Sequence, residues 1–332
     1  MQQIRIGLIG CGAVMAWHVQ NLLARADAAI VGLADPSPQQ LAQLVARRPT
    51  LAGLPAFRSY EEMFAALELD AVEVAIPHTL HYAVVKAALE RGLHVLCEKP
   101  LACEPAHARE LVALAKAGKH VLMVSYQRHF DPGYRYLKQQ IASSGLGDLR
   151  SIGVRIGQNW QQLTEGTWRQ DPALSGGGML MDSGSHLVDV LLWLVDRPVV
   201  RVAALLDQAG TPVDITSTIL LEFSGGLQAN LQIIGDLPAL WLEEMLISGT
   251  RGMLRYQSDP QHPWRAGVVE HWRGSEVVRP LELPEAPTSD ANWLDAIRGV
   301  AANEAPGILG LQVALVTAAI YEAAKIRQVV QL

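Results

Sequence analysis

The 332-residue sequence has few cysteines, no cluster of basic residues and few aromatic side chains. Its three cysteines, Cys11, Cys97 and Cys103, are scattered along the chain, so they predict neither a disulfide framework nor a metal site. The formal net charge is −6 and no run of lysine or arginine is present, which argues against a nucleic-acid partner. We therefore expect reduced thiols, no bound metal and no nucleic acid.

The sequence also lacks an obvious membrane or export signal. It opens Met1-Gln2-Gln3-Ile4-Arg5 and enters an apolar run directly, and the most apolar helical stretch, Leu187–Val195, contains Asp189. These features predict a cytoplasmic protein without a membrane partner. Half of the residues are hydrophobic and 18% are charged, so a well-buried core is expected, and the length predicts about two domains.

Residues 1–125 alternate short apolar runs with helical patterns. The runs predicted as strands are Ile4–Ile9, Ala29–Ala34, Asp70–Ile76, Leu93–Cys97 and His120–Ser125. Strands that alternate with helices require right-handed crossovers and a parallel sheet covered on both faces. The sequence therefore predicts an α/β fold whose N-terminal domain is a doubly wound, Rossmann-type parallel sheet.

Residues 126–332 have a different pattern. From Val199 onward the hydrophobic period falls to two, and Leu227, Ala229, Leu231 and Ile233 alternate with Gln228, Asn230 and Gln232. This alternation predicts a C-terminal α/β domain with a large, mostly antiparallel open sheet and helices on one face. The polar outer face is either solvated, the simpler interpretation, or packed on a second subunit. A last helix at about 307–327 is expected to pack back on the first domain.

A glycine-containing loop follows the first predicted strand. Gly10 is suited to a tight turn, and Gly12 would let the backbone, with Ala13 and Val14, approach a pyrophosphate at a helix N-terminus. Met15 stands where the dinucleotide fingerprint has a third glycine or an alanine, which loosens the expected contact between helix and strand. A plain turn is the alternative interpretation of this segment.

Asp35 ends the second predicted strand, twenty residues after Met15. An acidic side chain at this place binds the ribose hydroxyls of a dinucleotide. Residues 36–40 carry no positive charge for a 2′-phosphate, so the sequence favours NAD over NADP. The alternative is an ordinary surface aspartate.

Two further segments follow strands at the same sheet edge, where ligands of doubly wound sheets bind. Pro77, His78 and His81 follow the third predicted strand, and Glu98 and Lys99 follow the fourth. We expect all five to contact the cofactor. The alternatives are a capping or solvated His81 and a solvated Lys99, although Pro100 holds the Lys99 backbone extended.

Three glycines, Gly176 to Gly178, precede a helical pattern that carries Asp182, His186 and Asp189 on one face. A carboxylate beside an imidazole prepares a general base near neutral pH. The glycines are expected to let the backbone pass close to cofactor or substrate. A surface Asp–His pair is the alternative.

Taken together, these segments resemble the Gfo/Idh/MocA family of NAD(P)-dependent oxidoreductases. The residues that carry the resemblance are Gly10-Cys11-Gly12, Glu98-Lys99-Pro100, Trp168-Arg169, Gly176-Gly177-Gly178, Asp182 and His186. The resemblance extends over nearly the whole chain. It implies the two domains described above and a homodimer or homotetramer formed through the C-terminal sheet.

The resemblance also implies a catalytic group of Lys99, Asp182 and His186. His186 would be the general acid/base, Lys99 would stabilise negative charge on the reacting oxygen, and Asp182 would orient the imidazole or bind a neighbouring hydroxyl. The residues expected to bind substrate are these three together with Arg128, Trp160, Trp168 and Arg169. Packing or hinge roles are the alternatives for the last four.

The activity implied is hydride transfer between NAD and a secondary hydroxyl or keto group of a sugar, polyol or sugar derivative. Two alternatives remain open. The first is a redox-neutral enzyme that uses bound NAD to cleave a glycosidic bond. The second is a non-catalytic dinucleotide or sugar sensor, which is less favoured because a sensor needs no base.

Overall fold

The computed structural model describes residues 3–259, 261–262 and 267–332. The chain separates into two compact units, one formed by Met1–Tyr126 with Pro287–Leu311 and the other by Gln127–Ala286 with Gln312–Leu332. They are called unit 1 and unit 2 below. The predicted domain boundary after residue 125 stays a prediction, and unit 1 also includes Pro287–Leu311.

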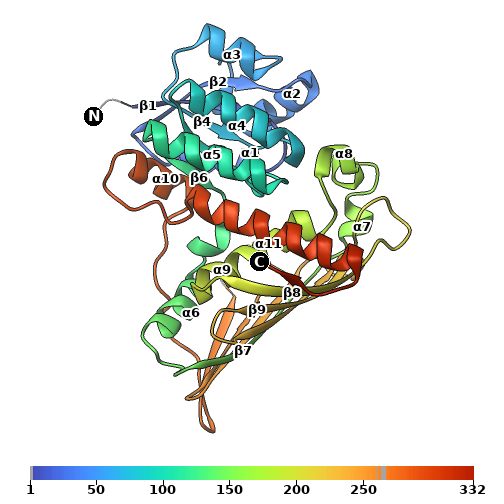
Figure 1. Cartoon of the computed structure of the whole chain (residues 1–332). Helices are drawn as coiled ribbons and strands as arrows, with labels where there is room; N and C mark the ends of the chain where they lie inside the picture. The colour runs from blue at the N-terminus through green and yellow to red at the C-terminus, as the bar shows by residue number, and fades with distance from the viewer. Residues whose placement is uncertain (1–2, 260, 263–266) are drawn as a thin grey trace. The chain divides into compact units, whose positions relative to one another are not determined.

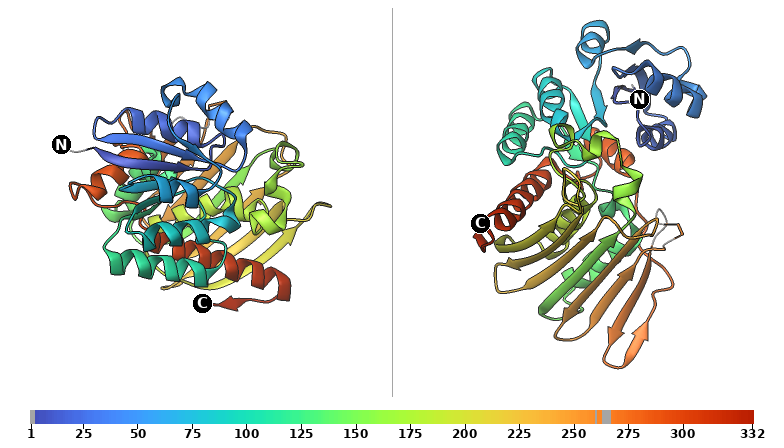
Figure 2. Two further views of the ribbon diagram at one scale, coloured as in Figure 1. Left: turned by 90° about the horizontal axis from the view of Figure 1, so that it is seen from above. Right: turned by 90° about the vertical axis from the view of Figure 1, so that its right-hand side faces the viewer.

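Unit 1 contains a six-stranded parallel sheet in the order β3-β2-β1-β4-β5-β6 (Figures 1 and 2). All four residues of β4 are buried, as expected of a central strand covered on both faces. The strand order changes direction between β1 and β4, so their carboxyl ends form a topological switch point. The predicted Rossmann-type sheet is confirmed. Its strands are β1 Ile4–Ile9, β2 Ala28–Ala34, β3 Ala56–Phe57, β4 Ala71–Val74, β5 His94–Cys97 and β6 Leu122–Val124.

Three helices of unit 1, α2, α3 and α10, begin at a side-chain cap. Ser37 accepts a hydrogen bond from the Gln40 N–H before α2, and Ser59 accepts one from the Glu62 N–H before α3. The sequence analysis did not include β3 or α3, which are short. The helices are α1 Met15–Leu23, α2 Pro38–Arg47, α3 Tyr60–Ala66, α4 His81–Glu90, α5 Pro105–Gly118 and α10 Ser289–Ile297, with short 3₁₀ turns η1 Pro49–Leu51 and η2 His78–Leu80.

Unit 2 contains a nine-stranded sheet in the order β14-β13-β12-β11-β7-β10-β9-β8-β15. All neighbouring strands are antiparallel except β7 and β10, which run parallel. Residues of β10 alternate between exposed and buried, which confirms the predicted period of two. The strands are β7 Leu149–Gly157, β8 Val199–Asp207, β9 Thr216–Phe223, β10 Gln228–Ile234, β11 Leu242–Gly249, β12 Met253–Gln257, β13 Val268–Arg273, β14 Glu276–Val278 and β15 Val330–Gln331.

Helices cover one face of this sheet, with α9 against β7 and α6 against β12 (Figure 2). The only side chain of α9 that is not buried is that of Trp193, because the helix lies inside the unit. The helical segments are η3 Gln127–Phe130, α6 Pro132–Ala142, α7 Trp160–Leu163, η4 Trp168–Gln170, α8 Pro172–Ser175, the π-helix η5 Leu180–Gly184 and α9 Ser185–Val195. The last helix, α11 Gly307–Ile326, begins in unit 1 and ends in unit 2, and its predicted packing stays a prediction.

In the part of the chain that the structure describes, two helical segments are long and apolar enough to span a membrane by length and composition, in contrast to the sequence-based expectation. Pro172–Val195 has a mean hydropathy of 1.2 and Gly307–Ile326 one of 1.6. However, 94% of the first apolar window and 56% of the second are buried inside the protein. Core helices of globular proteins meet the same criteria, so these segments are weak evidence for a membrane partner.

Candidate active site

The glycine loop after β1 has the geometry of a site for an anionic ligand. Gly10 has a φ of 87°, and a Cβ there would lie 2.1 Å from the Ala75 carbonyl oxygen, so a larger residue is excluded. A Cβ at Gly12 would meet no described atom within 4 Å, so the space beside this backbone is open. Val14, the residue before α1, makes no side-chain hydrogen bond to the helix. Amide groups of the first turn can therefore donate hydrogen bonds to a ligand or to water. Met15 is fully buried, so the missing third glycine is accommodated by packing.

Asp35 is held beside this loop. Its Oδ2 accepts a hydrogen bond of 2.8 Å from the Cys11 N–H, and its Oδ1 accepts one of 2.8 Å from the Ser37 N–H. Each carboxylate oxygen has a second lone pair, so Asp35 can still accept hydrogen bonds from ribose hydroxyls. The open space at Gly12, the amides at α1 and Asp35 together fit a dinucleotide. Direct contacts of Gly10, Gly12, Ala13, Val14 and Asp35 with the cofactor stay predictions.

His81 joins two loops at the carboxyl edge of the sheet. It is fully buried, with Nδ1 2.6 Å from the Pro100 carbonyl oxygen and Nε2 2.9 Å from that of Ile76. Burial lowers the pKa of His81. His78 is also buried, and its ring lies 5.9 Å from that of His81. Cofactor contacts of Pro77, His78 and His81 stay predictions, and this geometry favours a positioning role for His81.

Glu98 contacts His18, a fully buried residue of unit 1 that the sequence analysis missed. Its Oε1 lies 3.1 Å from Nε2 of His18, and its Oε2 accepts a hydrogen bond of 3.2 Å from the Lys99 N–H. The other nitrogen of His18 faces Glu73 and Asp290. The sequence offered one signal, because Glu73 is a charged residue inside the apolar strand β4. Cofactor contacts of Glu98 and Lys99 stay predictions.

The carboxyl groups around His18 shift one another's protonation. Burial alone would lower the pKa of His18, but Glu73 and Asp290 outweigh this effect and hold the pKa well above its usual value. Burial raises the pKa of Glu73 to about 7, although His18 opposes the shift. For Glu98, hydrogen bonding and attraction by His18 overcome the effect of burial, so its pKa is lowered. A protonated imidazole thus faces an ionised Glu98.

Glu73→Gln is expected to gain stability relative to the unaltered protein as the pH rises from 4.5 to about 7. The folded pKa of Glu73 is raised from its usual 4.5 to about 7, so its stabilising contribution is complete below pH 4.5 and is lost as the pH rises through 7. Glutamine mimics the protonated form and does not titrate. Urea unfolding of both proteins at four pH values measures the difference, and parallel stability curves would contradict the shift.

In unit 2, Asp182 lies in the π-helix η5 and His186 in the first turn of α9, and both side chains are buried. Asp182 Oδ2 accepts hydrogen bonds from Trp160 Nε1 at 2.8 Å and from Arg169 Nε at 2.9 Å. The Arg169 guanidinium lies 4.5 Å from the centre of the Trp168 ring. Four residues predicted to bind substrate are therefore brought together. Trp160 is buried and directs its N–H at Asp182, which favours a positioning role over stacking on a sugar.

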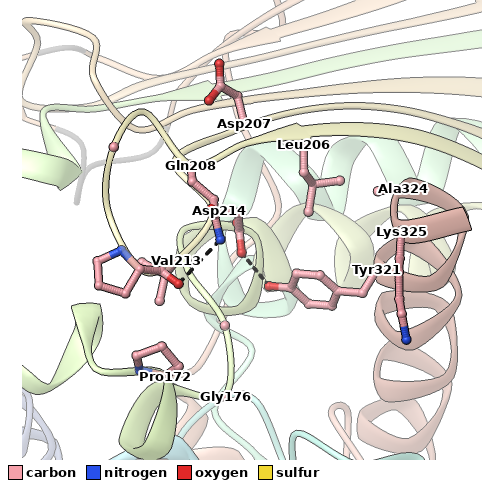
Figure 3. Close-up of a pocket in the computed structure, with 13 residues that line it drawn as sticks. Pro172, Gly176, Leu206, Asp207, Gln208, Val213, Asp214, Tyr321, Ala324 and Lys325 are labelled. Carbon is pink, nitrogen blue, oxygen red and sulfur yellow. Dashed lines mark hydrogen bonds between the residues drawn. The ribbon is translucent and has the colours of Figure 1, made fainter. Parts of the chain in front are cut away.

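The backbone at Gly178 passes close to Asp214. The sequence analysis expected the glycines to lie close to cofactor or substrate. A Cβ at Gly178 would lie 1.9 Å from the Asp214 carbonyl oxygen. The Asp214 carboxylate accepts hydrogen bonds of 2.8 Å from the N–H groups of Gly178 and Leu180, and one of 2.7 Å from the Tyr321 hydroxyl (Figure 3). Asp214 thereby fixes the start of the segment that carries Asp182.

Asp189 and Arg128 form separate buried pairs. Asp189 Oδ2 lies 2.9 Å from Nε2 of His129, a residue that the sequence analysis did not pair with it. Arg128 donates to both carboxylate oxygens of Glu243, which also accepts hydrogen bonds from the side chains of Tyr134 and Trp241. Glu243 is almost fully buried. A substrate contact of Arg128 stays a prediction, and this geometry favours a structural role.

Comparison with known proteins identifies the class of this chain. Residues 4–126 match the oxidoreductase family with an NAD-binding Rossmann fold, GFO_IDH_MocA, and residues 134–255 match the GFO/IDH/MocA C-terminal domain. The chain therefore belongs to the Gfo/Idh/MocA family, as the sequence motifs predicted.

Similar proteins include two curated dehydrogenases. Trans-1,2-dihydrobenzene-1,2-diol dehydrogenase of Xenopus tropicalis is 30% identical over 213 residues, which are 63% of this chain and 62% of that protein. Inositol 2-dehydrogenase of Corynebacterium glutamicum (strain R) is 31% identical over 208 residues, which are 60% of this chain and 57% of that protein. The chain thus spans about three fifths of the length of these relatives.

A solved structure is similar over the whole chain. The WlbA dehydrogenase from Chromobacterium violaceum, in complex with NADH and UDP-GlcNAcA, is 25% identical with a TM-score of 0.88. The similarity covers 100% of this chain and 96% of that one. Both units therefore have the folds found in this dehydrogenase.

Proposed function

We propose that this protein is an NAD-dependent oxidoreductase that transfers a hydride between nicotinamide and a secondary hydroxyl or keto group of a sugar, polyol or sugar derivative. The observation that carries the proposal is the loop at Gly10–Gly12 beside Asp35, which fits a dinucleotide, in a family of oxidoreductases. The names of the relatives, a dihydrodiol and an inositol dehydrogenase, support a hydroxylated substrate.

In this proposal, residues of the chain transfer the proton and stabilise the developing negative charge. When bound, NAD supplies the hydride-accepting carbon. His186 removes the hydroxyl proton as general base and returns it in the reductive direction. Lys99 stabilises negative charge on the reacting oxygen. Asp182, held by Trp160 and Arg169, keeps a fixed carboxylate one helical turn before His186.

A panel of polyols, aldoses, amino sugars and uronates tests this function. We expect at least one compound to give NADH when the protein is supplied with NAD, followed by absorbance. Turnover of a glycoside without net NADH would favour the redox-neutral alternative. Binding of NADH without turnover of any panel compound would contradict an oxidoreductase of this substrate class.

Asp35→Ala is expected to reduce the preference for NAD over NADP by about 10-fold, because the carboxylate binds ribose hydroxyls and repels a 2′-phosphate. Fluorescence titrations with NADH and NADPH measure the ratio of dissociation constants. Asp70→Asn is the matched control, since Asp70 precedes β4 at the opposite end of the sheet and pairs with Arg5. A preference for NADPH in the unaltered protein would refute the role of Asp35.

We also propose that the protein is cytoplasmic and forms a homodimer or homotetramer through the open face of the nine-stranded sheet. Cys11, Cys97 and Cys103 form no disulfide, which supports the location. The exposed side chains of Leu205, Leu220 and Leu246, on three strands of the sheet, support the interface. Sedimentation is expected to show an oligomer that Leu220→Lys weakens. A monomer at micromolar concentration would contradict this arrangement.

A further inference from the structure

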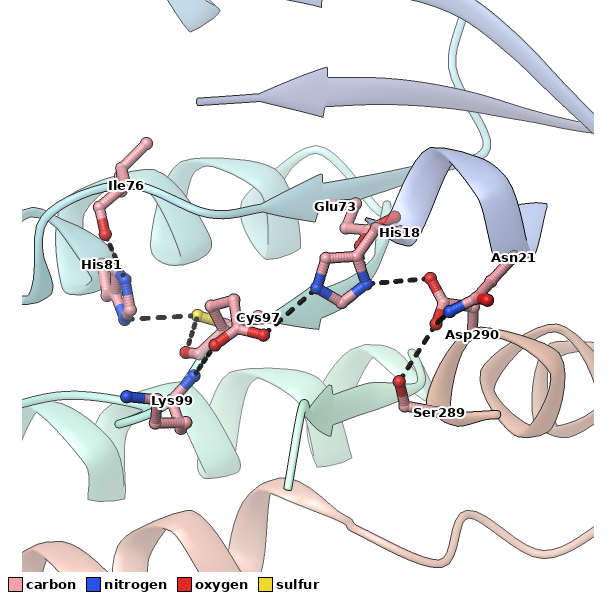
Figure 4. Close-up of polar contacts among 10 residues, drawn as sticks. His18, Asn21, Glu73, Ile76, His81, Cys97, Lys99, Ser289 and Asp290 are labelled. Carbon is pink, nitrogen blue, oxygen red and sulfur yellow. Dashed lines mark hydrogen bonds and ion pairs between the residues drawn. The ribbon is translucent and has the colours of Figure 1, made fainter. Parts of the chain in front are cut away.

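His18 lies among three carboxyl side chains of unit 1, of which those of Glu73 and Asp290 are buried and that of Glu98 is 12% exposed (Figure 4). Its Nδ1 is 2.5 Å from Oε1 of Glu73 and 2.9 Å from Oδ1 of Asp290, whereas its Nε2 is 3.1 Å from Oε1 of Glu98. A protonated imidazole has one N–H on each side. His18 therefore spans the space between Glu98 and the pair formed by Glu73 and Asp290.

This group connects α1 with the loop that carries Lys99. His18 lies in the first turn of α1, the helix that follows the glycine loop. Glu98 directly follows β5, and its second carboxylate oxygen accepts a hydrogen bond from the Lys99 N–H. A continuous set of contacts thus runs from the dinucleotide-binding helix through one imidazole and one carboxylate to the Lys99 backbone.

The far side of the imidazole is also fixed. Asp290 Oδ2 accepts hydrogen bonds from Asn21 Nδ2 at 2.9 Å and from Ser289 Oγ at 3.1 Å. Asp290 comes from α10, in the segment Pro287–Leu311 that returns to unit 1. Because buried ionic groups add little net stability over apolar packing, stability alone does not explain four titratable groups at this place.

The structure assigns His18 a positioning role: it holds the Glu98 carboxylate, and through it the Lys99 backbone, in a fixed relation to α1 and the glycine loop. This inference rests on the proposed function, in which Lys99 stabilises charge on the reacting oxygen. The contacts with Glu73 and Asp290 set the orientation of the imidazole, and the contact with Glu98 transmits that orientation. The role therefore depends on Nε2 more than on Nδ1.

Two variants separate these contacts. In His18→Gln the side-chain amide lies near the position of the His18 Nε2 atom, so the variant retains a hydrogen-bond donor for Glu98. In His18→Asn the side-chain amide lies near the position of Nδ1, so the variant retains a donor for Asp290 only. Amide hydrogen exchange of the peptide that contains Lys99 is expected to be about 10-fold faster in His18→Asn than in the unaltered protein, because a hydrogen bond to a charged group is lost. His18→Gln is expected to stay within about 2-fold.

Kinetics with any panel compound that gives NADH provide the second measurement. His18→Asn is expected to lower kcat by about 10-fold with little change in KM for NAD, because misplacement of a catalytic group affects the transition state. In a Lys99→Met background the same substitution is expected to cause no further loss of kcat, because His18 acts through Lys99. A merely structural role would give additive losses.

Equal exchange in the two His18 variants, or additive effects of His18→Asn and Lys99→Met on kcat, would overturn the inference. If no panel compound reacts, the proposed function fails, and the exchange comparison alone supports or overturns the positioning role. If His18→Asn does not fold, Glu98→Gln replaces it. That variant keeps the side-chain size, and unchanged exchange at Lys99 would then overturn the inference.

Discussion

Replacement of His186 by alanine is expected to lower turnover by roughly 10²–10⁴-fold while the affinity for NADH stays nearly unchanged. His186 is buried at the start of α9, one turn after a carboxylate that Trp160 and Arg169 hold in place. Without the imidazole, proton removal from the substrate hydroxyl depends on water, and hydride transfer slows. The cofactor is expected to bind through unit 1, which this substitution does not touch.

Initial rates of NADH formation and a fluorescence titration with NADH measure the two quantities. His262→Ala is the control, because the side chain of that histidine is 39% exposed and pairs with Asp259. Circular dichroism establishes that the variants are folded. Near-normal turnover in His186→Ala would remove His186 from the chemistry.

Replacement of Glu243 by alanine is expected to lower the free energy of unfolding by about 3–5 kcal/mol. The substitution leaves the buried Arg128 guanidinium without its carboxylate and removes the acceptor of the Tyr134 hydroxyl and the Trp241 N–H. A buried charge that loses its partner carries an uncompensated desolvation penalty. Urea unfolding of the two proteins gives the difference.

The adjacent residue offers a matched control for this substitution. Glu244 lies on the same strand as Glu243, β11, and pairs with Arg155 at 2.5 Å. However, the Arg155 side chain is 44% exposed. Glu244→Ala is therefore expected to change stability by no more than about 1 kcal/mol. Equal losses in the two variants would contradict the role assigned to the buried pair.

The effect of Glu243 is also expected to depend on pH. Burial opposes ionisation, but Arg128 and the hydrogen-bond donors lower the pKa of Glu243 below its usual 4.5. A lowered folded pKa means that the stabilising contribution is complete above pH 4.5 and is lost as the pH falls through the folded pKa. The difference between the unaltered protein and Glu243→Ala is therefore expected to shrink below pH 4.5.

Much of the fold followed from local patterns. The alternation of apolar runs and helices predicted the parallel sheet of unit 1, and the period of two around Leu231 predicted the mostly antiparallel sheet of unit 2. Short elements such as β3 and α3 were missed because two to seven residues carry little periodic signal. The sequence analysis did not assign α10 to either sheet, because no local pattern records which sheet a distant helix joins.

For the candidate site too, local sequence predicted some residues, and only the tertiary structure showed their partners. The glycine loop, Asp35 and the helix with Asp182 and His186 were found from the sequence, because a turn, a strand end and a helical face are defined by residues close together in the chain. Their partners were not found. Asp182 is held by Trp160, 22 residues earlier, and Gly178 by Asp214, 36 residues later.

The sequence by itself determined the family, the two sheets and the residue types available for cofactor binding and proton transfer. Tertiary structure alone decided which charges meet. His18 and Asp290 are 272 residues apart, yet their side chains lie 2.9 Å from each other, in a group that also contains the buried Glu73 and the partly buried Glu98. Burial and pairing shift a pKa only after the chain has brought such groups together, and that arrangement depends on topology, which local periodicity does not specify.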